Sequence, residues 1–149
     1  MKIAMYNIKE VSELMGISPH TLRYYEKIGL LEFVKRNEQG VREFSESDLL
    51  TLNTIYRLKQ TGMPLKEIKH YLALIKEGFA SVDERAQIML AQKKKVKAQI
   101  KVLEQALETI ENKLYFYKEA KKQGSLAVCT DEREQMLERL LKIKHTEQQ

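Results

Sequence analysis

Five neighbouring side chains near the start of the sequence, Ser18, His20, Thr21, Arg23 and Tyr24, suit contact with a nucleic-acid duplex. The guanidinium of Arg23 can bind guanine or phosphate through two parallel N–H groups. The hydroxyls of Thr21 and Tyr24 can hydrogen-bond phosphates, and the imidazole of His20 can approach a base edge. Ser18 is a favoured N-cap, and the free backbone N–H groups of the first helical turn can bind phosphate. These residue types therefore predict recognition of a polyanion.

The residues around this cluster predict a helix-turn-helix. Asn7 and Glu10 can form a capping box at the start of a first helix, and Gly16 can end it in the left-handed conformation. A second helix is predicted over residues 19–28, with proline in its first position and Gly29 after its end. An ordinary amphipathic helix would have the same aromatic core, which is the interpretation we adopt for Tyr25. The residues expected to face the core are Val11, Leu14, Met15, Ile17, Leu22 and Tyr25.

A β-hairpin is predicted over residues 33–44, because strand-forming residues flank the turn-forming residues 37–40. It carries three basic residues, Lys35, Arg36 and Arg42. A basic hairpin directly after a helix-turn-helix is typical of a wing that lies on phosphate or in a minor groove. Basic residues also protect exposed sheet edges, so the hairpin taken alone favours a solvated edge.

A second helix pair follows the hairpin. Ser45 and Asp48 can cap the first of these helices, Gly62 ends it, and Pro64 opens the next. Three basic residues of this pair are candidate phosphate contacts, although a solvated helix face explains them equally well: Arg57, Lys59 and Lys66. The predicted DNA-binding residues of the whole head are Ser18, His20, Thr21, Arg23, Tyr24, Lys35, Arg36, Arg42 and Lys59.

Residues 82–121 contain neither glycine nor proline and predict one long helix. Steps of three and four from Ala86 to Tyr117 select ten positions, of which only Lys93 is not apolar. This seven-residue repeat predicts a left-handed coiled coil about 60 Å long, at about 1.5 Å per residue. No other segment is long enough to cover the stripe, so the expected partner is a second copy, parallel or antiparallel. The predicted dimerisation residues are Met89, Val96, Ile100, Leu103, Leu107, Ile110, Leu114 and Tyr117.

A short helix is predicted over residues 131–144, with four apolar residues on one face that would pack on the coiled coil or on the partner subunit. The predicted fold class is mainly α: a winged helix-turn-helix head with a short β-hairpin wing, a long coiled-coil dimerisation helix and a short C-terminal helix. The corresponding domains are residues 1–80, 81–121 and 122–149.

The amino-acid composition limits the classes of protein to which this chain can belong. Of the 149 residues, 43% are hydrophobic and 32% charged, which is typical of a globular, helix-rich chain. The net charge of +5 is spread along the chain, since residues 1–80 hold 12 basic and 10 acidic residues. No apolar run approaches the length of a membrane span, and no signal peptide is expected. A single cysteine, Cys129, excludes an intrachain disulfide framework and fits a reducing cytoplasm.

No metal-ligand cluster, nucleophile constellation or phosphate-cradling glycine loop is present in the sequence. We therefore expect no enzymatic activity, no cofactor and no metal. Two other classes of protein remain alternatives to a regulator. One is an architectural or excisionase-like DNA-binding protein without effector switching, which does not need the long heptad helix. The other is a coiled-coil adaptor whose head binds protein, which predicts no salt-dependent DNA affinity.

The segments quoted above resemble the MerR family of bacterial transcription regulators over about residues 5–78. The most specific are TLRYYE at 21–26, GVREF at 40–44 and TGMPL at 61–65. The resemblance implies an antiparallel coiled-coil dimer, with DNA contacts from His20, Thr21, Arg23 and Tyr24 and from the wing around Arg36 and Arg42.

The resemblance also implies a mechanism. Family members bind a palindromic promoter operator between promoter elements that lie too far apart, and an effector makes the dimer bend and untwist this DNA for RNA polymerase. Metal-sensing relatives carry thiols at the start of the dimerisation helix, where this chain has Ala80, Ser81, Val82 and Asp83. Electrophile-responsive relatives carry a thiol in the helix after the wing, which this chain lacks. Cys129 alone is best interpreted as a small, partly buried residue.

Overall fold

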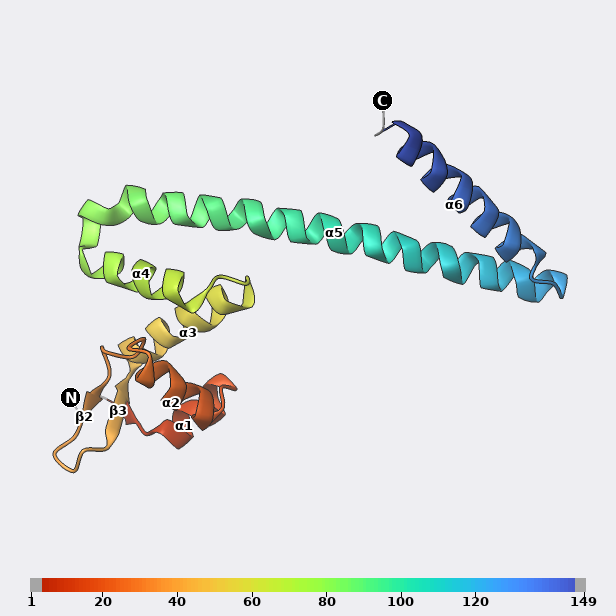
Figure 1. The fold of residues 1–149 in the computed structure, drawn as a ribbon. Helices are drawn as coiled ribbons and strands as arrows, with labels where there is room; N and C mark the ends of the chain where they lie inside the picture. Colours follow the sequence, from red (N-terminus) through yellow and green to blue (C-terminus); the bar gives the residue numbers. More distant parts are fainter. Residues whose placement is uncertain (1–3, 147–149) are drawn as a thin grey trace. The chain divides into compact units, whose positions relative to one another are not determined.

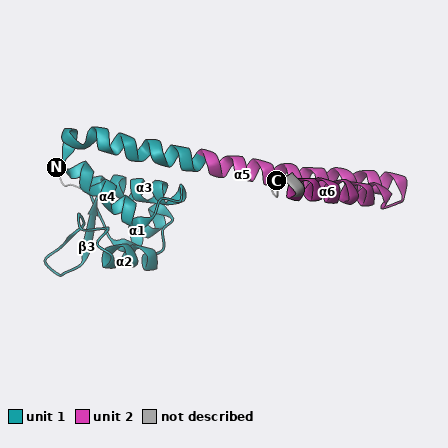
Figure 2. Ribbon diagram, turned by 45° about the horizontal axis from the view of Figure 1, so that its top comes forward, with its two compact units in different colours: residues 1–96 teal, residues 97–149 magenta. Residues whose placement is uncertain are grey.

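The computed structural model describes residues 4–146 (Figure 1). The chain forms two compact units, Met1–Val96 and Lys97–Gln149, which Figure 2 colours separately. The first unit contains the helices α1 to α4 and all three strands, whereas the long helix α5, Val82–Gln123, contributes to both units. The fold is mainly helical with one small antiparallel sheet, as the sequence predicted.

The predicted helix-turn-helix is present as α1, Ile8–Met15, and α2, Pro19–Lys27. The capping box of Asn7 and Glu10 opens α1, with Asn7 Oδ1 accepting from the Glu10 amide at 3.0 Å. Gly16 closes α1 with a φ of 66°, which a side chain would oppose. Ile17 is buried between the two helices, as expected. Leu14 is exposed, contrary to our prediction, because α1 reaches the core through Val11 and Met15.

The strands β1, Met5–Tyr6, β2, Lys35–Arg36, and β3, Arg42–Ser45, form a sheet in the order β1-β3-β2. β2 and β3 are the wing hairpin, and its turn is held by Asn37 Oδ1, which accepts the amides of Gln39 and Val41. The strands are shorter than predicted, because residues 30–33 form turns before β2. β1 was not predicted; it pairs with β3 at the other edge, with Tyr6 opposite Phe44.

The second helix pair is α3, Glu46–Gln60, and α4, Leu65–Lys76, followed by the short 3-10 helix η1, Gly78–Ser81. The predicted box of Ser45 and Asp48 caps α3. Together with α1, α2 and the sheet these helices enclose one core, whose buried residues are Val11, Ile17, Leu22, Tyr25, Leu30, Leu31, Phe44, Leu52, Ile55, Met63 and Ile68.

Helix α5 is anchored on the first unit through its opening turns. Ile88 and Met89 pack against the core, and Lys95 pairs with Glu67 of α4 at 3.8 Å. Gln92 is buried and donates from Nε2 to the carbonyl and the hydroxyl of Thr61, each at 3.0 Å. These contacts hold the part of α5 that belongs to the first unit, which ends at Val96.

In the second unit, α5 ends at Gln123, two residues beyond the prediction, and Gly124 follows with a φ of 62°. The last helix, α6, is Ala127–Thr146 and begins earlier than predicted, because Ser125 Oγ accepts the amide of Ala127 and starts the turn. Lys113 of α5 pairs with Glu132 of α6 at 3.0 Å. This ion pair joins α6 to α5 within the unit, and Figure 1 shows the two helices diverging from the turn that connects them.

Candidate nucleic-acid interface

Helix α2 divides its side chains between the core and solvent. Leu22 and Tyr25 are buried, and burial raises the pKa of the Tyr25 phenol. His20, Arg23 and Tyr24 are exposed, so the face predicted to meet DNA is open. Ser18 is the N-cap: its Oγ accepts the Thr21 amide at 3.1 Å and lies 2.9 Å from the Thr21 hydroxyl.

A hollow of about 240 Å³ lies between the N-terminus of α2 and the last turns of α3. Ser18 and Thr21 line it from the start of α2, and Tyr56, Lys59 and Gln60 line it from α3. Free N–H groups at a helix start, hydroxyls and an ammonium group are the usual ligands of a phosphate. The hollow thus brings Lys59 close to Thr21 of the predicted α2 set, although Thr21 lies 38 residues earlier in the sequence.

Tyr56 and Gln60 also line this hollow but are not among the contacts predicted from the sequence. Tyr56 is partly buried and packs against the core, whereas Gln60 is exposed. The helical spacing offered a signal, since residues three and four apart share a face and Tyr56 and Gln60 therefore flank the surface of Lys59.

The wing presents its basic residues unequally. Lys35 is exposed on β2, with Glu43 opposite it on β3. Arg36 is half exposed, and its guanidinium donates to Glu26 at 2.8 Å and to the Gly40 carbonyl at 2.7 Å. Arg42 retains only 15% of its side-chain exposure and pairs with the other oxygen of Glu26. Burial, and secondarily the charge of Arg23, lower the pKa of Arg42.

The residues predicted for dimerisation divide between the two units. Met89 packs against the head of its own chain and Val96 is half buried. Within the second unit, five seam residues expose more than half of their surface: Leu103, Leu107, Ile110, Leu114 and Tyr117. Ile100, the first seam residue of this unit, is about half exposed.

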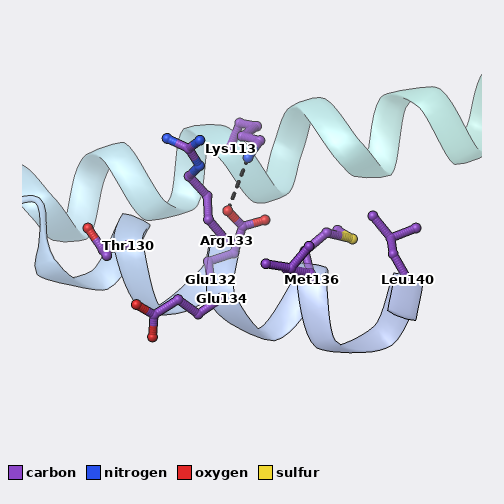
Figure 3. Close-up of a pocket in the computed structure, with 8 residues that line it drawn as sticks. Lys113, Thr130, Glu132, Arg133, Glu134, Met136 and Leu140 are labelled. Carbon is purple, nitrogen blue, oxygen red and sulfur yellow. Dashed lines mark hydrogen bonds and ion pairs between the residues drawn. The ribbon is translucent and has the colours of Figure 1, made fainter. Parts of the chain in front are cut away.

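An open groove of about 510 Å³ lies between α5 and α6 in the second unit (Figure 3). The Lys113–Glu132 pair crosses it, and the apolar side chains of Met136, Leu137 and Leu140 line it from α6. The predicted apolar face of α6 is thus exposed and continuous with a concave surface.

Among the residues that the structure describes, no three His, Cys, Asp or Glu side chains are placed to hold a metal ion. Cys129 is a free, partly buried thiol. None of the described helices is long and apolar enough to cross a membrane.

The arrangement of α1, α2 and the β2–β3 hairpin, with an exposed polar helix face beside a basic hairpin, defines a winged helix-turn-helix protein. Residues 6–75 match the family model of the MerR HTH family regulatory protein, and residues 49–113 match the model named MerR, DNA binding. An uncharacterized HTH-type transcriptional regulator of Haemophilus influenzae is 42% identical over 121 residues, which cover 81% of this chain and 90% of the relative.

Solved structures agree with this assignment. The crystal structure of HiNmlR, a MerR family regulator lacking the sensor domain, bound to promoter DNA, shares 42% identity with a TM-score of 0.75, covering 84% of this chain and 96% of HiNmlR. A MerR family regulator from Bacillus thuringiensis shares 35% identity with a TM-score of 0.69, covering 75% and 98%. The chain belongs to the MerR family. It is a DNA-binding transcriptional regulator and not an enzyme.

Proposed function

We propose that this regulator binds a palindromic promoter operator as a homodimer and controls transcription by distorting that DNA. The observation that carries the proposal is the open face of α2, where His20, Arg23 and Tyr24 are exposed beside the Ser18–Lys59 hollow. The binding of HiNmlR to promoter DNA supports it, because the two chains share 42% identity over most of their lengths.

The contacts divide by chemistry. We assign reading of base edges in the major groove to Arg23 and His20, since a guanidinium or an imidazole can bond guanine acceptors. Phosphate contacts are assigned to Thr21 and Lys59, together with the amides that open α2, because the hollow gathers donors and one positive charge. Tyr24 lies outside the hollow, and its exposed hydroxyl is assigned to a phosphate as well. Lys35 and Arg36 of the wing would meet the backbone or the minor groove on the flank.

Dimerisation is assigned to the seam of α5 in the second unit. Leu103, Leu107 and Leu114 are each more than half exposed, and burial of one such side chain is worth about 1.5–3 kcal/mol. A second copy is the occupant whose seam has the same repeat, and family resemblance favours the antiparallel arrangement. The groove beside α6 would then receive apolar side chains of the partner subunit.

The two heads of such a dimer would bind two half-sites, which explains a palindromic operator. Bending and untwisting cost energy that depends on the DNA sequence, so part of the specificity would come from shape rather than from base edges. RNA polymerase is the partner that would respond to the realigned promoter elements, and the site of action is the cytoplasm.

The test is DNase footprinting on DNA around the gene that encodes this regulator, with wild type and Arg23→Ala at two salt concentrations. We expect a symmetric footprint between the promoter elements that weakens steeply with salt and is lost or much reduced in the variant. Absence of any specific footprint for the wild type would refute the proposed binding to this operator. A footprint without any change in transcription in vitro would favour an architectural protein instead.

A further inference from the structure

Glu26 lies on the recognition helix α2 and pairs with both strands of the wing. One carboxylate oxygen accepts from Arg36 of β2 at 2.8 Å, and the other contacts the guanidinium of Arg42 of β3. The sequence separations are 10 and 16 residues, so these pairs join two elements that are otherwise connected by turns. Figure 1 shows the hairpin lying next to the helix pair of the head.

The charges around Glu26 are unbalanced without it. Arg36 and Arg42 are directly opposite in the strand register, where like charges destabilise a hairpin. Arg23 lies three residues before Glu26 on the same face of α2, and its charge also acts on Arg42. Glu26 is the acidic side chain that bonds to the wing arginines, and 31% of its side chain is exposed.

The two wing arginines differ in what they can still offer to DNA. Arg36 keeps 53% of its exposure, so it can present remaining donors to a phosphate while it holds Glu26. Arg42 is largely buried, and its Nε is enclosed without a partner among the described residues. The position of Arg42 suits support of the wing better than the direct DNA contact predicted from the sequence.

We propose that Glu26 is a positioning residue for DNA recognition, which fastens the wing to the recognition helix so that both meet the operator at a fixed spacing. Arg42 acts through Glu26, and Arg36 both holds Glu26 and faces the DNA. The inference rests on the proposed function, because it concerns how the same DNA-binding surface is built.

The proposal predicts an effect of unexpected sign. An ordinary acidic side chain near a polyanion repels it, so neutralising such a residue tightens DNA binding. Neutralising Glu26 should instead weaken binding, because two opposed guanidiniums lose their common partner and the wing leaves its position. The expected loss is about tenfold in the affinity of the dimer, or about threefold for each of its two heads, which is the net contribution of roughly one hydrogen bond per head.

The experiment compares Glu26→Gln with Glu38→Gln in the full chain, on the operator defined by the wild-type footprint. Glu38 is the matched control, because it is exposed in the turn of the same hairpin and forms no hydrogen bond or ion pair among the described residues. The readouts are the dissociation constant, hydroxyl-radical cleavage on the flank beneath the wing, methylation protection of guanines beneath α2, and thermal unfolding.

We expect Glu26→Gln to bind about tenfold more weakly and to lose protection on the flank while guanine protection persists at saturation. Glu38→Gln should bind as well as wild type or more tightly. Glu26→Asp, which keeps the charge but shortens the side chain by one methylene, should fall between wild type and Glu26→Gln. If Glu26→Gln is unfolded at the assay temperature, Glu26→Asp is the variant that decides the outcome.

Tighter or unchanged binding by Glu26→Gln with an intact flank footprint would overturn the proposal. Equal loss of both kinds of protection would overturn it too, since it would indicate general damage to the head; if Glu26→Gln is unfolded, wild-type behaviour of Glu26→Asp overturns it. Failure of the wild type to give any footprint would instead refute the proposed function, so the two failures are distinguishable.

Discussion

Replacing Lys59 by glutamine tests whether the hollow at the start of α2 holds a DNA phosphate. The substitution removes one ammonium group from each head, and hence two from a dimer. Each lost phosphate contact lowers the slope of log K against log[salt] by about 0.9, so the slope should fall by about 1.8. Raising the salt concentration from about 50 to 200 mM should lower the affinity of both proteins. The fold-decrease for the variant should be about 12 times smaller than the fold-decrease for the wild type.

The assay is fluorescence anisotropy of labelled operator DNA titrated at four salt concentrations. Lys101→Gln is the control, because it removes the same charge from an exposed site on α5 in the second unit, outside the proposed interface. The control should retain the wild-type slope. A Lys59→Gln slope equal to that of the wild type would show that Lys59 is a solvated surface residue, and the phosphate function of the hollow would be refuted.

Three further perturbations test other parts of the molecule. Leu107→Asp should convert the dimer to a monomer in light scattering, because it places an unpaired charge in the seam; a stable dimer of this variant would contradict the coiled-coil assignment. Gln92→Ala should lower the free energy of unfolding in urea by about 1–3 kcal/mol at fixed protein concentration, since two hydrogen bonds to Thr61 are lost; an unchanged midpoint would show that this anchor contributes nothing. Arg42→Gln should weaken operator binding without lowering the salt slope, and a slope reduced as in Lys59→Gln would identify Arg42 as a phosphate contact.

The features of the fold that the sequence predicted correctly are those set by neighbouring residues. The capping boxes of Asn7 with Glu10 and of Ser45 with Asp48 each span three residues, so their signal is local and both are present. The stop at Gly16 follows from the same kind of local rule, since a left-handed residue without a side chain ends a helix.

The features that were missed depend on contacts between distant residues. β1 contains only two residues and exists because it pairs with β3, about 40 positions later, so no local pattern marks it. The pairing of Glu26 with Arg42 likewise joins separate elements, and the sequence presented Arg42 simply as one more basic residue of the wing. The DNA-binding set as a whole stays a prediction, although the exposure of Arg23 and Tyr24 is compatible with it.

Gln92 shows why a polar residue can be buried where α5 packs on the head. Thr61 is the C-cap of α3, and the carbonyl groups at a helix end lack partners within the helix. The amide of Gln92 supplies that partner, whereas an apolar residue would leave the partly buried Thr61 carbonyl unpaired at a cost of about 1–3 kcal/mol. Lys59 and Gln60 immediately precede Thr61, so the hydrogen bond that anchors α5 fixes the same helix end that lines the phosphate hollow. The dimerisation helix and the proposed DNA contacts therefore share one buried attachment point within the first unit.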